Sequence, residues 1–242
     1  MAGEYQDYFD GDVACEAYVA GLGDGSRRPA VLVAHQWAGQ SDSERATADR
    51  LAELGYVGIA IDVYGKGRRG EEGTATALAV NSALMEPFTR DRRMLLERLN
   101  VAVDFAKEHP AVDPERIAVI GYCFGGLCAL DVARSGRDDV RGAVSIHGIF
   151  APPALLPQLP IKAKVLVLHG WDDPMAKPDD AVGLAKELTD AGADWQLHAY
   201  GHAMHAFTNP HANMPDRGLA YNEAAAQRSW RAMVDFLQEV LA

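Results

Sequence analysis

The 242-residue chain has only three cysteines, Cys15, Cys123 and Cys128. So small and odd a number does not form a disulfide framework, and it fits the reducing cytoplasm. No uninterrupted apolar run approaches the roughly 18–20 residues of a membrane span. The first twelve residues contain four acids and neither Lys nor Arg, which is unlike a secretory signal. We therefore expect a cytoplasmic protein with no membrane partner.

Basic residues are also scarce. Lys and Arg number 23 against 34 for Asp and Glu, which gives a net charge of −11 and argues against a nucleic-acid partner. Hydrophobic residues make up 48% of the chain, too many for a disordered protein. No linker divides the sequence, so we expect a single domain over residues 1–242, as a monomer or small homo-oligomer.

Short apolar segments alternate with helical patterns along the chain. The predicted strands cover residues 30–35, 56–62, 117–121, 142–147, 164–169 and 194–200. The predicted helices begin after a capping box at Ser41 and Glu44, span about 89–108 and 127–134, start again at Pro178 and end the chain. Residues 65–73 are too polar and Gly-rich for either regular structure. This alternation predicts an α/β fold whose mostly parallel sheet has helices on both faces, with an active site at the carboxyl ends of strands.

The segment GYCFGG (121–126) follows the apolar strand IAVIG and opens a helix. It has the form of a nucleophile elbow, a sharp turn with small residues two positions before and after the nucleophile. Gly121 and Gly125 remove side chains that would collide in such a turn. Cys123 would then lie at a helix N-terminus, where the dipole favours a thiolate. A Gly-rich turn around a buried structural cysteine is the alternative interpretation.

A thiol nucleophile needs a base, and the base needs a group that orients it. In hydrolase folds the order along the chain is nucleophile, acid, histidine. Asp173 follows the strand 164–169 in a G-x-x-D pattern, and we prefer it to Asp172 as the acid. His205 is followed by a small residue and Phe207, and we prefer it to His202 as the base.

Acyl transfer also requires donors for the oxyanion. The backbone N–H of Phe124 follows the nucleophile directly, and the Trp37 N–H is our candidate from the loop HQWAG (35–39). His35, His147 and His169 end predicted strands, where they could line a pocket or pack loops. The histidines show no zinc spacing, and Cys123 and Cys128 are too far apart for a redox pair. We therefore expect no metal and no cofactor.

At these residues the sequence resembles the dienelactone hydrolase family, the carboxymethylenebutenolidase-like α/β-hydrolases. The matching segments are HQWAG (35–39), IDVYG (61–65), GYCFGG (121–126), HGWDDP (169–174) and HAFTNP (205–210). The resemblance implies a sheet of about eight strands. It also implies hydrolysis of lactones or esters by a triad in which Cys123 is the nucleophile, His205 the acid and base, and Asp173 the orienting group.

Two features differ from the family pattern. Gln36 stands where the family usually has a Glu that helps to activate the cysteine, so we expect His205 to activate Cys123 directly. No Arg follows His205 closely to hold a substrate carboxylate, since the next one is Arg217. Arg90, Arg92 and Arg93 could take that role or form an exposed helical cluster.

The sequence therefore predicts a cofactor-free carboxylic ester hydrolase that acts on small esters or lactones through a thioester intermediate. Beyond the triad and the two oxyanion donors, Gln36, Tyr122, Trp171 and Phe207 are candidates for supporting the site or contacting substrate. The alternatives are a thioesterase or peptidase that uses the same triad, and a non-catalytic ligand-binding protein with a hydrolase fold.

Overall fold

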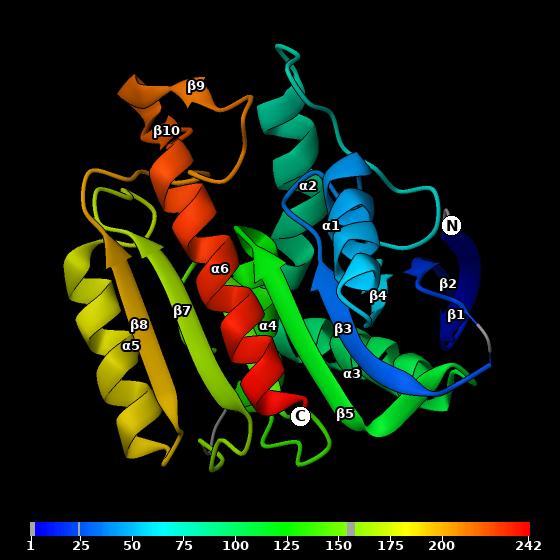
Figure 1. Cartoon of the computed structure of the whole chain (residues 1–242). Coiled ribbons are helices and arrows are strands. Elements are labelled where there is room, and N and C mark those ends of the chain that lie inside the picture. The colour runs from blue at the N-terminus through cyan, green and yellow to red at the C-terminus, as the bar shows by residue number, and fades with distance from the viewer. Residues whose placement is uncertain (1–2, 24, 154–157) are drawn as a thin grey trace. The chain divides into compact units, whose positions relative to one another are not determined.

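A computed structural model describes residues 3–23, 25–153 and 158–242 (Figure 1). Its contacts divide the chain into two compact units, residues 1–119 and 120–242. The single domain over residues 1–242 stays a prediction. The sequence between the predicted strands 142–147 and 164–169 contains four prolines and indicates a loop, of which Pro157 lies outside the described residues.

Eight strands form the main sheet, in the order β1-β2-β4-β3-β5-β6-β7-β8. They are β1 (Glu4–Asp10), β2 (Val13–Ala20), β3 (Arg28–Ala34), β4 (Val57–Ala60), β5 (Val112–Tyr122), β6 (Gly142–Ile146), β7 (Lys164–Gly170) and β8 (Trp195–Tyr200). Within this sheet the pairs β3/β4, β6/β7 and β7/β8 are parallel, and the pairs β1/β2 and β2/β4 at one edge are antiparallel. The predicted α/β fold with a mostly parallel sheet is confirmed.

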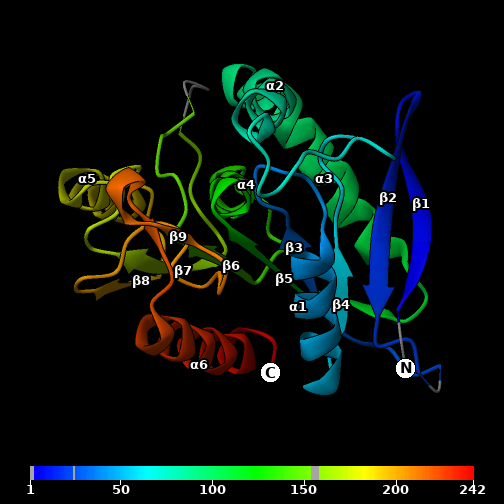
Figure 2. The ribbon, with the colours of Figure 1, turned by 90° about the horizontal axis from the view of Figure 1, so that it is seen from above.

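In the first unit, α1 (Asp42–Glu53) packs on β3 and β4, with α3 (Arg92–Glu108) on the opposite side of these strands (Figure 2). The predicted capping box begins α1, because Ser41 accepts a hydrogen bond from the Ser43 N–H while Glu44 accepts one from the Ser41 N–H. In the second unit, α4 (Phe124–Arg134) and α5 (Pro178–Asp190) lie on one face of β6–β8, and α6 (Glu223–Val240) covers the other (Figure 2).

Several local predictions were wrong or incomplete. The helix expected over 89–108 begins at Arg92, because the Asp91 side chain accepts the N–H groups of Arg93 and Met94 and so caps it. Thr89 belongs to a separate helix, α2 (Ala77–Arg90). The suggested exposed cluster of arginines is also wrong in part, since Arg92 is buried.

Some short elements were not predicted at all. They are the β1–β2 hairpin, the two-residue strands β9 (Asn213–Met214) and β10 (Leu219–Ala220), and a 3-10 turn at Pro215–Arg217. Within the part of the chain that the structure describes, no helix has the length and apolar character needed to cross a membrane.

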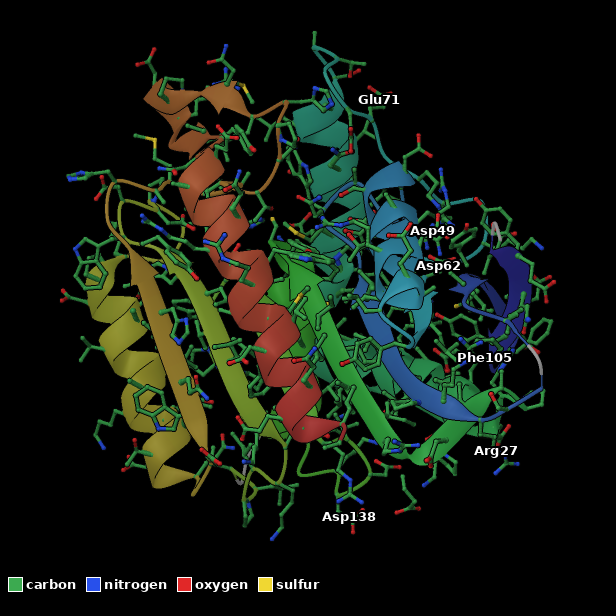
Figure 3. The ribbon with its side chains drawn as sticks, viewed as in Figure 1. Arg27, Asp49, Asp62, Glu71, Phe105 and Asp138 are labelled. Atoms are coloured by element: carbon green, nitrogen blue, oxygen red, sulfur yellow. The ribbon has the colours of Figure 1, made fainter. Side chains whose placement is uncertain are left out.

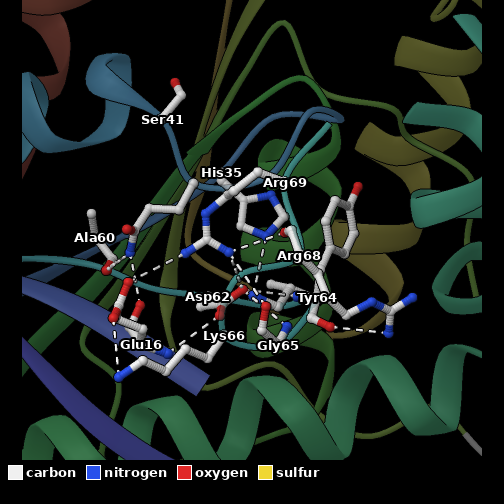
Figure 4. A network of polar contacts seen from close by, with 12 residues as sticks. Glu16, His35, Ser41, Ala60, Asp62, Tyr64, Gly65, Lys66, Arg68 and Arg69 are labelled. Carbon is white, nitrogen blue, oxygen red and sulfur yellow. Dashed lines mark hydrogen bonds and ion pairs between the residues drawn. The ribbon is translucent and has the colours of Figure 1, made fainter. Parts of the chain in front are cut away.

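A buried carboxylate holds the segment IDVYG in the first unit (Figure 4). Asp62 is fully buried and accepts hydrogen bonds from the N–H groups of Glu16, Tyr64 and Gly65. Arg69 contacts the same carboxylate at 3.3 Å. Figure 3 labels Asp62 in this unit together with Asp49, which accepts a hydrogen bond from the Tyr18 hydroxyl. The four donors around Asp62 satisfy its charge and fix the turn that follows β4.

Candidate active site

Cys123 lies between β5 and α4 in a strained backbone conformation. Its φ is +55°, a value that residues with a side chain rarely adopt. A Cβ on Gly121 would lie 2.1 Å from the carbonyl oxygen of Gly125, so the turn requires glycine at position 121. The Cys123 N–H donates to the Ile146 carbonyl at 3.1 Å, which ties the turn to β6. The thiol is partly exposed at the N-terminus of α4.

His205 and Asp173 form a hydrogen-bonded pair in the same unit. Nδ1 of His205 lies 2.7 Å from Oδ2 of Asp173, and both side chains are almost completely buried. The other carboxylate oxygen of Asp173 accepts the Met175 N–H at 2.8 Å. With both of its oxygens bound, the Asp173 carboxylate is fixed in orientation and in turn fixes the imidazole ring.

Cys123 lies close enough to His205 to affect its protonation. Burial by itself lowers the pKa of His205, but the charge of Cys123 and the hydrogen bond to Asp173 outweigh burial and raise that pKa to about 10. Nε2 is buried and makes no well-aligned hydrogen bond to the described residues. Cys123 still raises the pKa of His205, both through its charge and through a contact between the two side chains.

The neighbouring acid and histidine are arranged differently. His202 is 98% exposed and Asp172 is 45% exposed, and the closest approach of the two side chains is 3.7 Å. A pair so open to solvent gains little from its attraction. The geometry thus favours Asp173 over Asp172 and His205 over His202.

The backbone around His205 holds its loop against the strand β10. The His205 N–H donates to the Gly218 carbonyl at 2.9 Å, and the Ala220 N–H donates to the His205 carbonyl at 3.2 Å. Ala206 has a φ of +57°. Any residue with a Cβ is strained in that conformation, so the contacts with β10 must hold this turn.

The other candidates of the second unit lie around these groups. Phe124 is the first residue of α4, so its N–H is at the helix N-terminus next to Cys123. Tyr122 precedes Cys123 at the end of β5, and Phe207 is fully buried behind His205. Trp171 is 42% exposed, with its ring 6.2 Å from that of His169. The structure gives these residues a location, and their roles toward a substrate stay predictions.

Gln36 and Trp37 belong to the first unit, on the loop after β3. The Gln36 N–H and side-chain amide approach the buried carboxylate of Glu44 at 3.4 and 3.5 Å. The Trp37 carbonyl accepts the Tyr64 hydroxyl at 2.9 Å. His35 Nε2 accepts the Val63 N–H, and burial lowers the pKa of His35 to about 4, so this ring is neutral. These contacts fix the loop, and the roles of Gln36 and Trp37 toward Cys123 stay predictions.

Two further histidines of the second unit are completely buried. His147 follows β6 with its ring 5.2 Å from that of His205, and both ring nitrogens of His169 lack a partner among the described residues. From the sequence, His147 and His169 were identified only as histidines at the ends of predicted strands. No sequence feature distinguished their roles from that of His35. Over residues 3–23, 25–153 and 158–242, no group of three or more His, Cys, Asp and Glu side chains could hold a metal ion.

The model of the dienelactone hydrolase family matches residues 15–241. The chain is 26% identical to a Bradyrhizobium protein named "Probable 2-oxo-3-(5-oxofuran-2-ylidene)propanoate lactonase", over 92% of this chain and 88% of that protein. It is also 26% identical to an Aquifex aeolicus protein with the provisional name carboxymethylenebutenolidase, over 88% and 89%. Among solved structures, it resembles a dienelactone hydrolase-like promiscuous phosphotriesterase from metagenomic libraries, with TM-score 0.89, 32% identity and coverage of 99% and 98%.

The elbow gives a prediction about stability. Gly121→Ala should lower the free energy of unfolding by about 3 kcal/mol or more, because the added methyl group meets backbone atoms that cannot move aside. Gly183→Ala is the matched control, since its added methyl group meets nothing within 4 Å and should stabilise α5 by roughly 0.5–1 kcal/mol. Urea unfolding measures both changes. A Gly121→Ala protein as stable as the parent would contradict the steric account of the turn.

Proposed function

We propose, because the chain belongs to the dienelactone hydrolase family, that this ester hydrolase cleaves small esters or lactones with Cys123 as nucleophile, His205 as general acid and base, and Asp173 as the orienting carboxylate. The observation that carries the proposal is the buried 2.7 Å contact between His205 and Asp173. Cys123, on its strained turn, raises the pKa of the same ring. In space, the proposed base thus lies between the proposed nucleophile and the orienting carboxylate, which is the arrangement that acyl transfer requires.

The reaction has two half-reactions. Because its pKa is raised to about 10, His205 already holds the proton of Cys123 at neutral pH, and the Cys123 thiolate attacks the carbonyl carbon to form a tetrahedral oxyanion. The C–O bond then breaks, and the leaving oxygen receives the proton from His205, which leaves a thioester on Cys123. In the second half, His205 takes a proton from water as the water oxygen attacks the thioester. The C–S bond breaks, the acid is released, and His205 keeps the proton beside the restored thiolate.

The developing oxyanion needs fixed donors. The Phe124 N–H, at the first position of α4, is one proposed donor. The Trp37 N–H is the other, by the position of its loop in the family pattern. Loss of one such donor typically costs about 2.7–4 kcal/mol of transition-state stabilisation.

The substrate class follows from the charges near His205. The segment HAFTNP (205–210) contains no Arg or Lys that could pair with a substrate carboxylate. A neutral ester or lactone therefore fits this chain at least as well as an anionic dienelactone. Tyr122 and Trp171 are the proposed apolar contacts and Gln36 a polar one, while the fully buried Phe207 would support the site from inside. We keep the cytoplasm as the proposed location, and small molecules rather than nucleic acids or membranes as partners.

A second activity is favoured by the similarity to the promiscuous phosphotriesterase. A neutral phosphotriester presents a tetrahedral phosphorus, whose substituents resemble those of the tetrahedral intermediate in ester hydrolysis. We propose that the Cys123 sulfur attacks such a phosphorus centre and that the P–O bond to the best leaving group breaks as His205 gives its proton to the leaving oxygen. Water, deprotonated by His205, then attacks the phosphorus, the S–P bond breaks, and a phosphodiester is released.

Replacing the nucleophile tests the proposal most simply. Cys123→Ala should lower kcat/KM for a neutral nitrophenyl ester by at least about 10³-fold while the protein stays folded. Hydrolysis of a dialkyl nitrophenyl phosphate should be lost with it. Cys128→Ala removes a buried cysteine from the same helix and should keep both activities.

The parent protein should also be assayed with thioesters, peptides and anionic lactones. Comparing kcat/KM for these substrates with kcat/KM for the neutral ester tests the thioesterase and peptidase alternatives. Full ester hydrolysis by Cys123→Ala would refute the nucleophile. A folded parent protein that hydrolyses none of these substrates would favour the non-catalytic alternative.

The raised pKa of His205 gives a pH prediction. A group with a raised pKa keeps its proton to higher pH, and His205 must hold a proton to give to the leaving oxygen. kcat/KM should therefore fall only as the pH rises through about 10. Asp173→Asn removes one of the interactions that raise this pKa, so the fall should move to lower pH and kcat should drop by roughly 10⁴-fold.

Asp172→Asn, at the exposed neighbouring carboxylate, is the matched control and should leave the profile unchanged. A fall of kcat/KM centred near pH 6.5 in the parent protein would contradict the assignment of His205. An Asp173→Asn profile identical to that of the parent would contradict the role of Asp173.

A further inference from the structure

His147 follows β6 in a backbone conformation that histidine rarely adopts. Its φ is +37°, and its side chain is completely buried. Its N–H donates to the Leu168 carbonyl at 2.9 Å, and the carbonyl of the preceding Ile146 accepts the Cys123 N–H at 3.1 Å. Such strain persists only where the surroundings hold it, and it concentrates at functional sites. Here the strained residue is held between β7 and the turn that carries the proposed nucleophile.

The ring of His147 packs against residues on both sides of the proposed reaction centre. It meets the ring of His205 at 5.2 Å and 65°, and the ring of Phe207 at 5.2 Å and 80°. It lies 5.8 Å from the ring of Tyr122, the residue before Cys123. The edge of one ring meets the face of another in the contacts with His205 and Phe207, which restricts rotation of the His205 imidazole.

A hydrogen bond joins His147 to the loop that carries His205. Nε2 of His147 lies 2.8 Å from the Thr208 hydroxyl oxygen. Thr208 comes three residues after His205, and the intervening Ala206 has a positive φ. His147 therefore anchors the far end of this short strained segment, while β10 holds its near end.

The charge state of His147 suits this position. Burial lowers its pKa well below the usual value, and the charge of His205 lowers it further. His147 is therefore neutral at neutral and alkaline pH. A neutral ring can pack against a protonated His205 without repelling it.

We propose that His147 is a positioning residue for His205, which it holds in place by ring packing and by its hydrogen bond to Thr208. This inference rests on the proposed function, because it requires His205 to be the acid and base of the reaction. His147 itself touches neither the substrate nor the transferred proton.

The Thr208 hydroxyl offers the cleanest test, because Thr208→Val keeps the shape of the side chain and removes only the hydrogen bond. We expect Thr208→Val to lower kcat about 10-fold with KM unchanged within twofold. Thr208→Ser keeps a hydroxyl and should restore kcat to within twofold of the parent. Asn at position 147 can adopt the positive φ of His147. His147→Asn should therefore fold, and it should lower kcat at least as much as Thr208→Val. Adding Thr208→Val to His147→Asn should cause little further loss, since the shared bond is already gone.

The pH profile separates positioning from simple loss of stability. In Thr208→Val and His147→Asn, the alkaline fall of kcat/KM should move at least half a pH unit lower, because a loosely held His205 loses part of its contact with Asp173 and Cys123. His202→Asn is the matched control: it also has a positive φ, lies three residues before His205, and is exposed. Its kcat and pH profile should match those of the parent.

Three outcomes would overturn the inference. The first is that Thr208→Val and His147→Asn, both folded, keep kcat within twofold of the parent. The second is that Thr208→Ser is as slow as Thr208→Val, and the third is an unmoved alkaline fall. If His147→Asn fails to fold, the Thr208→Val and Thr208→Ser pair decides the question alone. If Cys123→Ala is inactive and the Thr208 variants are normal, only this inference fails, whereas an active Cys123→Ala overturns the proposed function as well.

Discussion

The hydrogen bond between His205 and Asp173 is the interaction on which the proposed chemistry depends. It joins the loop after β7 to the loop after β8, and it is shielded from water because both side chains are buried. In that setting the carboxylate stabilises a protonated imidazole much more than it would at the surface. Asp172 and His202 lie only a few residues away but are exposed to solvent and approach no closer than 3.7 Å. Water screens the attraction between them, so this pair contributes little stabilisation.

Backbone strain gathers around this interaction. The described residues with a side chain and a positive φ are Cys123, His147, His202 and Ala206, all in the turns that follow strands of the second unit. Each such conformation costs on the order of 1–3 kcal/mol. The cost is met by backbone hydrogen bonds from β6, β7 and the β10 segment, which hold the turns in place. A sheet with regular strands thus carries irregular turns at the one edge where chemistry is proposed.

Much of the fold could be predicted from the sequence because strands of a parallel sheet are continuous apolar runs and the elbow has a distinctive spacing of glycines. The predicted start of α3 was wrong because the prediction did not consider Asp91 as a helix cap. The helical pattern of the sequence continues from α2 into α3, so it does not reveal the break between them. The β1–β2 hairpin was overlooked although Asp10-Gly11 is a turn signal, because apolar residues such as Tyr5 and Phe9 are exposed in β1 and the strand lacks a clear apolar-polar alternation. His147 could not be singled out, since its place beside His205 arises only when β6 and the loop after β8 come together.

Trapping the acyl group is the most direct test of the central claim. The protein would be mixed with a slowly deacylating nitrophenyl ester, quenched in acid within the first turnover, digested and analysed by peptide mass spectrometry. The account predicts one acyl group per chain on the peptide that contains Cys123, formed at the rate of the nitrophenol burst. An acyl group on Cys15 or Cys128, or rapid turnover with no covalent adduct on any peptide, would contradict it.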